Sequence, residues 1–242
     1  MKIKKLKINR FEIIKNLDGN SNFGVELGVA EGNFSSQMME SNKFKLFYGI
    51  DSYNTFQHND KEFENTKKKL SIYKNYKLIR SSFEDSLSHF KDNSIDFLYI
   101  DGFAHEGNDG GKTLSEWVKK VKIGGICAGD DYHDDWPLLK KIINYYIEYN
   151  KLDLYVTQNS SDEKYSNYPS WFFFKKTNNQ FKLPQQFITE SKIKREHENF
   201  KRSFFGRIVY FNYKFQIYFY LKKIIPNNIF VILLKYYKFF SR

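Results

Sequence analysis

The feature that most constrains the fold is an apolar segment that ends in acidic residues. Residues 126–133, Ile-Cys-Ala-Gly-Asp-Asp-Tyr-His, begin as a short apolar strand and end in two carboxylates and an imidazole. Residues 95–100 form a second, mostly apolar strand, which Asp101 follows. In an open α/β sheet the carboxyl ends of the strands line the ligand crevice. The pattern therefore predicts buried strands whose acidic ends, at Asp101, Asp130 and Asp131, share one site.

Short apolar strands alternate with helical segments along the first three quarters of the chain. This order predicts βαβ units and a parallel sheet, and strands without polar alternation predict helices on both of its faces. Strands are expected at 23–27, 45–50, 76–80, 95–100 and 125–129, with 152–157 and 171–175 as a closing pair. Helices are expected at 33–39, 61–73, 83–90, 111–121 and 136–149.

Charge divides the chain into a nearly neutral body and a basic tail. Residues 191–242 contain 12 Lys and Arg and two Glu, so they carry +10 of the net charge of +11, and they hold 15 of the 46 aromatic residues. The alternating pattern stops at about Lys182. We therefore expect an α/β domain over 1–182 and a basic, aromatic-rich helical extension over 183–242. The apolar run 229–234 is too short for a membrane span, which needs about 20 apolar residues.

The tail is compatible with three kinds of partner. Basic and aromatic residues together can bind nucleic acid, attach to an anionic membrane surface or a protein partner, or pack on the body or a second copy in a homo-oligomer. Nothing else in the chain resembles a nucleic-acid module, so nucleic acid is disfavoured. The favoured hypothesis is peripheral attachment of residues 191–242 near a glycan-assembly complex at the inner face of the membrane.

Two features indicate the compartment. The amino terminus lacks the apolar run of a signal peptide, so we expect a cytoplasmic protein. The single cysteine, Cys127, excludes a disulfide framework, and its apolar strand indicates a small buried side chain.

A glycine turn follows the first expected strand. Residues 26–32 have the form Glu-x-Gly-x-x-x-Gly, in which Gly28 and Gly32 permit a tight turn and close approach of a ligand to the backbone. The Gly-x-Gly-x-x-Gly fingerprint of dinucleotide binding is absent. A carboxylate at Glu26 repels a pyrophosphate and attracts a cation. Asp51, which closes the second strand, can bind the hydroxyls of a ribose. A ribose and a cation together suggest S-adenosylmethionine (SAM).

Four motifs in order resemble those of a known family. They are Glu26-Leu27-Gly28-x-x-x-Gly32, Gly49-Ile50-Asp51, Ile100-Asp101-Gly102 and Gly124-Gly125-Ile126 with Gly129-Asp130-Asp131-Tyr132. Over residues 23–175 the series resembles the class I SAM-dependent methyltransferases. More closely, it resembles the small-molecule O-methyltransferase branch, which includes metal-dependent catechol-type and sugar-modifying enzymes. The resemblance implies a Rossmann-like seven-stranded sheet with its last strand antiparallel.

The resemblance also implies a set of cofactor-binding residues. Glycine-turn residues would flank the methionine part of SAM, the end of the second strand would bind the ribose, and Ser82 and Phe83 would lie near the adenine. The set is Glu26, Gly28, Gly32, Asp51, Ser52, Ser82, Phe83 and Asp101. Two simpler roles stay open: Asp51 as a strand-end cap, and Ser82 as the cap of the helix that begins at Phe83.

The three acids also match the metal ligands of the metal-dependent members. These enzymes place one acid after the fourth strand and two adjacent positions after the fifth, which correspond here to Asp101, Asp130 and Asp131. Carboxylate oxygens suit Mg²⁺ or Mn²⁺ rather than zinc, and a metal on the acceptor hydroxyl would lower its pKa. The alternative is that Asp130 and Asp131 cap the helix near Trp136 or bind substrate without metal.

Two histidines, His105 and His133, compete as the general base, with Asp101 as a further catalytic candidate. Family members commonly carry a histidine or lysine three positions after the acid that matches Asp101. Ala104 stands at that position here and His105 follows it, so the assignment between His105 and His133 stays open. His58 and His89 are expected on the surface.

The sequence thus predicts a SAM-dependent O-methyltransferase. Its expected acceptor is a hydroxyl of a small molecule, a sugar or nucleotide sugar of surface polysaccharide biosynthesis, facing the loop 53–60 and residues 132–136. One alternative is a non-catalytic SAM-fold module held at a membrane or partner by its tail. The other is a nicotinamide-dependent oxidoreductase, which the missing third glycine disfavours.

Overall fold

The computed structural model describes residues 2–55, 58–102, 107–158, 168–178 and 181–203, together with 225–226, 228–229 and 231–232. The chain forms two compact units, Met1–Ser191 and Lys192–Arg242. The first unit contains every motif that the sequence singles out. Among the described residues, no helix is both long and apolar enough to cross a bilayer.

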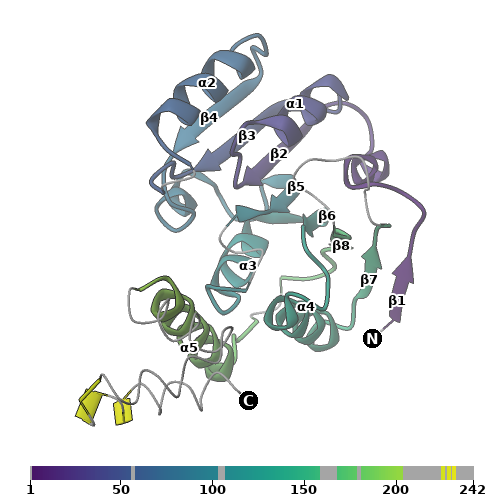
Figure 1. Ribbon diagram of the computed structural model, residues 1–242. Helices are drawn as coiled ribbons and strands as arrows, with labels where there is room; N and C mark the ends of the chain where they lie inside the picture. The colour runs from purple at the N-terminus through teal and green to yellow at the C-terminus, as the bar shows by residue number, and fades with distance from the viewer. Residues whose placement is uncertain are drawn as a thin grey trace. The chain divides into compact units, whose positions relative to one another are not determined.

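The first unit is built on an eight-stranded sheet with the order β1-β7-β8-β6-β5-β2-β3-β4 (Figure 1). Its strands are β1 (Lys2–Lys5), β2 (Asn22–Leu27), β3 (Phe44–Asp51), β4 (Tyr76–Arg80), β5 (Ile95–Ile100), β6 (Val121–Gly129), β7 (Asp153–Val156) and β8 (Trp171–Phe174). All pairings are parallel except those of β8, which runs antiparallel to β6 and β7. The structure confirms the Rossmann-like sheet with an antiparallel last strand.

One strand more than the predicted seven is present. β1 pairs with the outer edge of β7, with Lys2 opposite Asp153 and Lys4 opposite Tyr155. The Lys4 ammonium also lies 2.7 Å from the Asp153 carboxylate. The sequence hides this strand because three of its four residues are lysines, which are typical of a charged edge strand rather than of a buried one.

Helices cover both faces of the sheet, as predicted (Figure 1). The helices of the described residues are η1 (Arg10–Asn16), α1 (Asn33–Glu40), α2 (Asp60–Leu70), η2 (Asp85–His89), α3 (Lys112–Trp117), η4 (Val118–Lys120), α4 (Pro137–Tyr149) and α5 (Gln185–Arg202), the last of which continues into the second unit. On one face Ile13 of η1 and Phe34 of α1 pack in one cluster with Phe97. On the other, Trp117 and Ile142 share a cluster with strand residues that include the buried Cys127.

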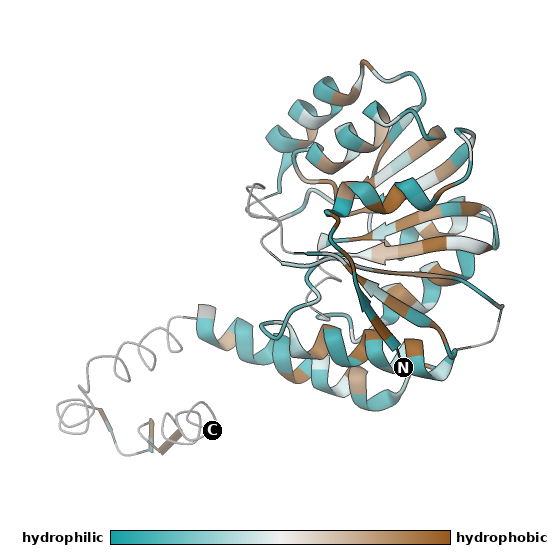
Figure 2. Ribbon diagram, turned by 90° about the vertical axis from the view of Figure 1, so that its right-hand side faces the viewer, coloured by the Kyte–Doolittle hydropathy of each residue, from teal (hydrophilic) through white to brown (hydrophobic). Residues whose placement is uncertain are grey.

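Hydrophobic residues are most frequent in the strands, and hydrophilic residues are most frequent in the helices and loops (Figure 2). The first unit continues past the alternating pattern, because Phe187 at the start of α5 is 1% exposed and packs edge-on against Tyr145 of α4. The predicted division of the chain at residue 182 remains a prediction.

Candidate active site

The glycine turn after β2 touches the end of β5. Gly28 has φ +92°, and its N–H donates to the Ile50 carbonyl of β3 at 2.9 Å. A Cβ at Gly28 would lie 2.7 Å from the amide nitrogen of Gly102 and 2.9 Å from the carbonyl carbon of Asp101. A side chain is therefore excluded at Gly28, and the structure brings the first and third motifs together at the carboxyl edge of the sheet.

The carboxylate of Asp51 holds this turn through backbone hydrogen bonds. The N–H groups of Val29 and Ala30 donate to its Oδ2 at 2.9 and 3.0 Å, and the N–H of Tyr53 donates to Oδ1 at 3.1 Å. This is the strand-end role that the sequence left open for Asp51. A carboxylate has about four acceptor positions, so these three bonds leave room for a hydroxyl. Ribose binding stays a prediction.

Two hydroxyls hold the opposite side of the turn. The phenol of Tyr53 and the hydroxyl of Thr66 both donate to the carbonyl of Ala30 at 2.8 Å. Burial raises the pKa of Tyr53, and the Asp51 charge adds to this, so the phenol remains a donor. Tyr53 is 1% exposed and lies under the turn. That the loop 53–60 faces the acceptor stays a prediction. Thr66 lies in the middle of α2, and no local pattern of residues distinguishes it as a partner of the turn.

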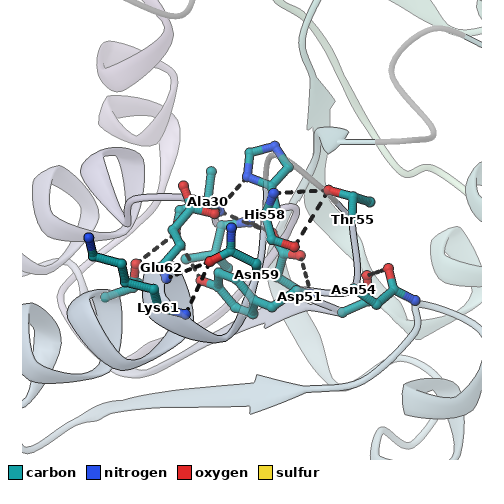
Figure 3. Close-up of polar contacts among 12 residues, drawn as sticks. Ala30, Asp51, Asn54, Thr55, His58, Asn59, Lys61 and Glu62 are labelled. Carbon is teal, nitrogen blue, oxygen red and sulfur yellow. Dashed lines mark hydrogen bonds and ion pairs between the residues drawn. The ribbon is translucent and has the colours of Figure 1, made fainter.

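The loop that follows β3 carries its own polar network (Figure 3). The His58 ring bonds through Nδ1 to Glu62 at 2.7 Å, and the side chain of Asn59 caps α2. His58 is 41% exposed at its side chain, which confirms its expected surface position. The hydroxyl of Ser52 donates to Asn54 within the same loop at 2.8 Å, and its predicted cofactor contact stays a prediction.

Glu26 lies buried beneath the turn rather than open to the crevice. It is 1% exposed and accepts the hydroxyl of Ser35, which also lies 2.9 Å from the phenol oxygen of Tyr76. A Cβ at Gly49 would stand 1.9 Å from that phenol, so Gly49 provides the space for the network. Burial raises the pKa of Glu26 well above its usual range, and the nearby charge of Asp101 adds to the rise.

Ser82 and Phe83 have separate environments. The hydroxyl of Ser82 accepts the N–H of Asp85 at 3.1 Å and donates to the Asp85 carboxylate at 2.6 Å, so it holds the turn that leads into η2. The helix begins at Asp85 rather than at Phe83, and its N-cap residue is Glu84. The ring of Phe83 lies 3.5 Å from where a Cβ of Gly102 would stand, so Phe83 borders the glycine contact as expected for an adenine neighbour.

The acid after β6 is bound on both of its oxygens. Asp130 is 2% exposed, and its Oδ2 accepts Nη1 of Arg10 at 3.1 Å while its Oδ1 accepts the hydroxyl of Ser170 at 2.9 Å. The same Nη1 lies 3.9 Å from Oδ2 of Asp101. A guanidinium from η1 therefore joins the acidic ends of β5 and β6. Arg10 and Ser170 were both missed by the sequence analysis.

The donor set does not fit the predicted Mg²⁺ or Mn²⁺. Asp130 has a partner on each oxygen, and the guanidinium that binds it stands beside Asp101. Within the described ranges, no three His, Cys, Asp or Glu residues are grouped so that they could hold a metal. Asp131 has a left-handed backbone, with φ +62°, and is buried. The metal prediction for these acids is not supported, and we assign no step to a metal.

The alternative role of the acid pair as a helix cap is also not seen. α4 begins at Pro137 with Trp136 in the cap position and without a side-chain cap bond. Asp130 instead accepts the indole N–H of Trp171 on its carbonyl at 3.2 Å. The pair therefore belongs to the end of β6 and to the contacts across the sheet.

His133 stands in an aromatic cluster after β6. Its ring stacks on Tyr168 with centroids 4.5 Å apart, and the N–H of Asp135 donates to its Nδ1 at 3.3 Å. Tyr168 donates its phenol to the Asp135 carboxylate at 2.5 Å, which raises the pKa of Tyr168. The ring of Trp136 meets Tyr168 edge-on at 6.4 Å. His105 lies outside the described residues, so the choice between the two histidines stays open.

Comparison with known proteins finds a family model and solved structures that resemble this part of the chain. Residues 25–132 match a family model described as "Methyltransferase domain", a span that contains all four motifs. No curated protein sequence matches the chain. Similar solved structures include a putative O-methyltransferase from Klebsiella pneumoniae, with 11% identity, TM-score 0.53, and coverage of 69% of this chain and 78% of that one.

Another is the O-methyltransferase from Bacillus cereus in complex with SAH (S-adenosylhomocysteine), with 10% identity, TM-score 0.52, and coverage of 68% and 79%. The chain spans only 51% of the CurJ carbon methyltransferase, to which 68% of it aligns with 12% identity and TM-score 0.49. At such identities the Klebsiella and Bacillus structures show the fold alone. The match over residues 25–132 and this shared fold agree with the methyltransferase domain that the four motifs predict.

Proposed function

We propose that the chain is an O-methyltransferase that moves the methyl group of SAM to a hydroxyl of a small molecule. The observation that carries this proposal is the convergence of the glycine turn, Asp51 and Asp101 at the carboxyl edge of β2, β3 and β5. Ligands of open α/β sheets bind at that edge. The Bacillus cereus structure is described as an O-methyltransferase and the Klebsiella pneumoniae structure as a putative one, and both descriptions support oxygen as the acceptor atom.

The chemistry asks little more of the protein than positioning and a base. Bound SAM supplies a methyl group on a sulfonium, so the acceptor oxygen forms a bond to the methyl carbon as the carbon–sulfur bond breaks and its electron pair goes to sulfur. An alcohol is a poor nucleophile at neutral pH, so a side chain must take the hydroxyl proton. His105 and His133 are our candidates for that role, and Asp101 is our candidate for binding the acceptor.

The surroundings of His133 set a condition on its use as a base. When Nδ1 accepts the N–H of Asp135, Nε2 of the neutral ring carries the proton and cannot accept another. The Asp135 carboxylate lies 3.5 Å from the same Nδ1. In the other tautomer Nδ1 carries the proton and donates it to that carboxylate, so Nε2 becomes the free acceptor. Asp135 then orients the ring, as a hydrogen-bond partner of the second nitrogen does in catalytic histidines. His133 as a base therefore depends on Asp135.

We also propose a sugar or nucleotide sugar of surface polysaccharide biosynthesis as the acceptor. The cluster of His133, Tyr168 and Trp136 presents aromatic rings next to the acidic end of β6. Aromatic faces provide apolar surface for the C–H groups of a sugar, and the carboxylate of Asp135 beside the rings, 57% exposed at its side chain, can accept its hydroxyls. This combination supports a carbohydrate over a wholly apolar acceptor.

Calorimetry with S-adenosylhomocysteine, NAD and NADP tests the cofactor. We expect binding of S-adenosylhomocysteine alone, whereas binding of NAD or NADP without it would favour the oxidoreductase alternative. Transfer of tritiated methyl from SAM to a panel of UDP-sugars then tests the reaction. Loss of turnover in Asp101→Ala with S-adenosylhomocysteine binding retained identifies an enzyme. Absence of turnover with every sugar and with simple catechols would favour the binding module.

The base is identified by comparing His105→Gln, His133→Gln and Asp135→Asn, with His89→Gln in η2 as the matched control. The variant of the true base loses the acidic limb of the pH–rate profile, because that limb reports its protonation. A parallel loss in His133→Gln and Asp135→Asn would support His133. Full activity in both histidine variants would remove both from the proposal.

For the tail we propose peripheral attachment, from the cytoplasmic side, to an anionic membrane. The support is the charge of +10 on residues 191–242 together with their aromatic content. The full chain should sediment with vesicles that contain 30 mol% phosphatidylglycerol and not with pure phosphatidylcholine vesicles, and salt should release it. Equal, negligible sedimentation in both cases would reject the attachment, and a salt-insensitive dimer in ultracentrifugation would favour packing between copies.

A further inference from the structure

We propose that the guanidinium of Arg10 supplies the positive charge beside Asp101 and Asp130, in place of the divalent metal that the sequence predicted there. Its importance for methyl transfer rests on the proposed function, whereas its position between the acids does not. Arg10 is a positioning residue in this proposal, because it acts through Asp130 and Asp101 rather than on the reacting atoms.

The contacts of the guanidinium support a permanent charge pair. Arg10 is 8% exposed at its side chain, and the Asp130 side chain that it binds is 3% exposed. A buried charge is stable only where it is paired and hydrogen-bonded, and a guanidinium keeps its charge at every working pH. The rings of Phe11 and Phe34 lie 5.2 and 5.4 Å from the guanidinium carbon, which adds cation–π attraction.

Local sequence fixes the place from which Arg10 reaches the acids. Asn9 and Glu12 form a reciprocal capping box: the Glu12 N–H donates to Asn9 at 3.1 Å, and the Asn9 N–H donates to Glu12 at 3.0 Å. Arg10 is therefore the first residue of a well-started η1. The buried Ile13 and Ile14 anchor this helix to the sheet face. The guanidinium is thus delivered by a rigid element rather than by a mobile loop.

The other side of Asp130 is equally fixed. Ser170 donates to its second oxygen at 2.9 Å, and the Ser170 hydroxyl lies 3.0 Å from the phenol of Tyr99. A carboxylate bound in this way has a set orientation beside a permanent positive charge. Asp101 is 25% exposed, against 3% for Asp130, so it is the acid of this pair that faces the crevice.

A metal-binding measurement on the full chain tests the inference without requiring turnover. Mn²⁺ is titrated into the protein and the free ion is followed by electron paramagnetic resonance. We expect no stoichiometric binding by the wild type, and at least ten-fold tighter binding in Arg10→Ala because two neighbouring carboxylates lose their cation. The rise should vanish in the double variant with Asp130→Asn. Arg10→Lys should behave as the wild type, and Lys15→Ala, on the same helix, is the control.

Two results would overturn the inference. One is 1:1 binding of Mn²⁺ to the wild type that Asp130→Asn abolishes. This result would overturn the inference even if Arg10→Ala does not fold. The other is identical Mn²⁺ binding by a folded Arg10→Ala and the wild type. Failure of the proposed function is seen separately, as absence of S-adenosylhomocysteine binding in calorimetry. Once turnover is established, Arg10→Ala should lower kcat with the KM for SAM unchanged, Arg10→Lys should restore part of it, and EDTA should have no effect.

Discussion

Replacement of Gly28 by alanine tests whether the glycine contact builds the cofactor site. The added Cβ would stand 2.7 Å from the amide nitrogen of Gly102 and 2.9 Å from the carbonyl carbon of Asp101. Both are backbone atoms, so no side chain can turn away to relieve the clash. The ends of β2 and β5 must separate, and Asp101 must move with them.

Two costs contribute to the expected loss of stability. A left-handed backbone, here with φ +92°, costs about 1–2 kcal/mol for a residue with a Cβ. Overpacking against fixed neighbours adds about 1–3 kcal/mol. The matched control is Gly124→Ala, because Gly124 has φ +84° but nothing within 4 Å of its added Cβ. The control carries only the first cost, so the difference between the variants isolates the second.

Urea unfolding of both variants measures this difference, and calorimetry with S-adenosylhomocysteine measures its effect on the site. We expect Gly28→Ala to be less stable than Gly124→Ala by about 1–3 kcal/mol and to bind S-adenosylhomocysteine at least ten-fold more weakly, while Gly124→Ala binds as the wild type. Equal stability of the two variants, with unchanged binding in Gly28→Ala, would refute the reasoning that this contact shapes the site.

Three further predictions address the polar groups. Asp51→Asn replaces charge-assisted acceptor bonds worth about 1.5–3 kcal/mol each, so calorimetry should show S-adenosylhomocysteine affinity reduced at least ten-fold; unchanged affinity would contradict the role of Asp51 in the turn. Glu26 has a raised pKa when folded, so its contribution to stability falls as pH rises above about 4.5. Glu26→Gln should become the more stable protein as pH increases in urea unfolding, and parallel pH curves would reject this. Ser170→Ala should cost about 1–3 kcal/mol by leaving Asp130 without one partner, which thermal unfolding would detect, whereas an unchanged Tm would show that the bond contributes nothing.

The strands were predictable because the sheet is buried on both faces. Residues 95–100 lack polar alternation, and in the structure Phe97 and Leu98 are fully buried on opposite faces. β6 begins at Val121, earlier than predicted, and Gly124 lies within it, where its N–H donates to the Lys175 carbonyl at 2.7 Å. The pairing of β6 with β5 shifts register in this region, between Ile95 and Phe97. A glycine that ends a strand and a glycine inside a strand look the same in the sequence. The start of β6 could therefore not be predicted from Gly124.

The cofactor side of the site was more predictable than the acceptor side. Gly28 and Asp51 are read from local signals, a glycine after a strand and an acid at a strand end, and the structure gives both a defined contact. Tyr53 and Thr66, which also hold the turn, have no such signal, because a buried hydroxyl bond to a carbonyl depends on how α2 packs. Residue type alone does not distinguish them from surface residues.

The acids at the ends of β5 and β6 show where local reasoning fails. Clustered carboxylates repel one another unless a positive charge lies beside them. The need for that charge can be predicted from the sequence, but the residue or ion that supplies it cannot. In this structure the positive charge comes from Arg10, which lies 120 positions from Asp130 along the chain. Several lysines precede Arg10, so the sequence does not single it out as the partner of these acids. Because a guanidinium is a fixed single charge with hydrogen-bond donors, it orients Asp130 but cannot act as a Lewis acid on an acceptor oxygen. In the proposed reaction, the removal of the acceptor proton would therefore fall to a neutral base, and Asp101, which is more exposed than Asp130, is our candidate for binding the acceptor.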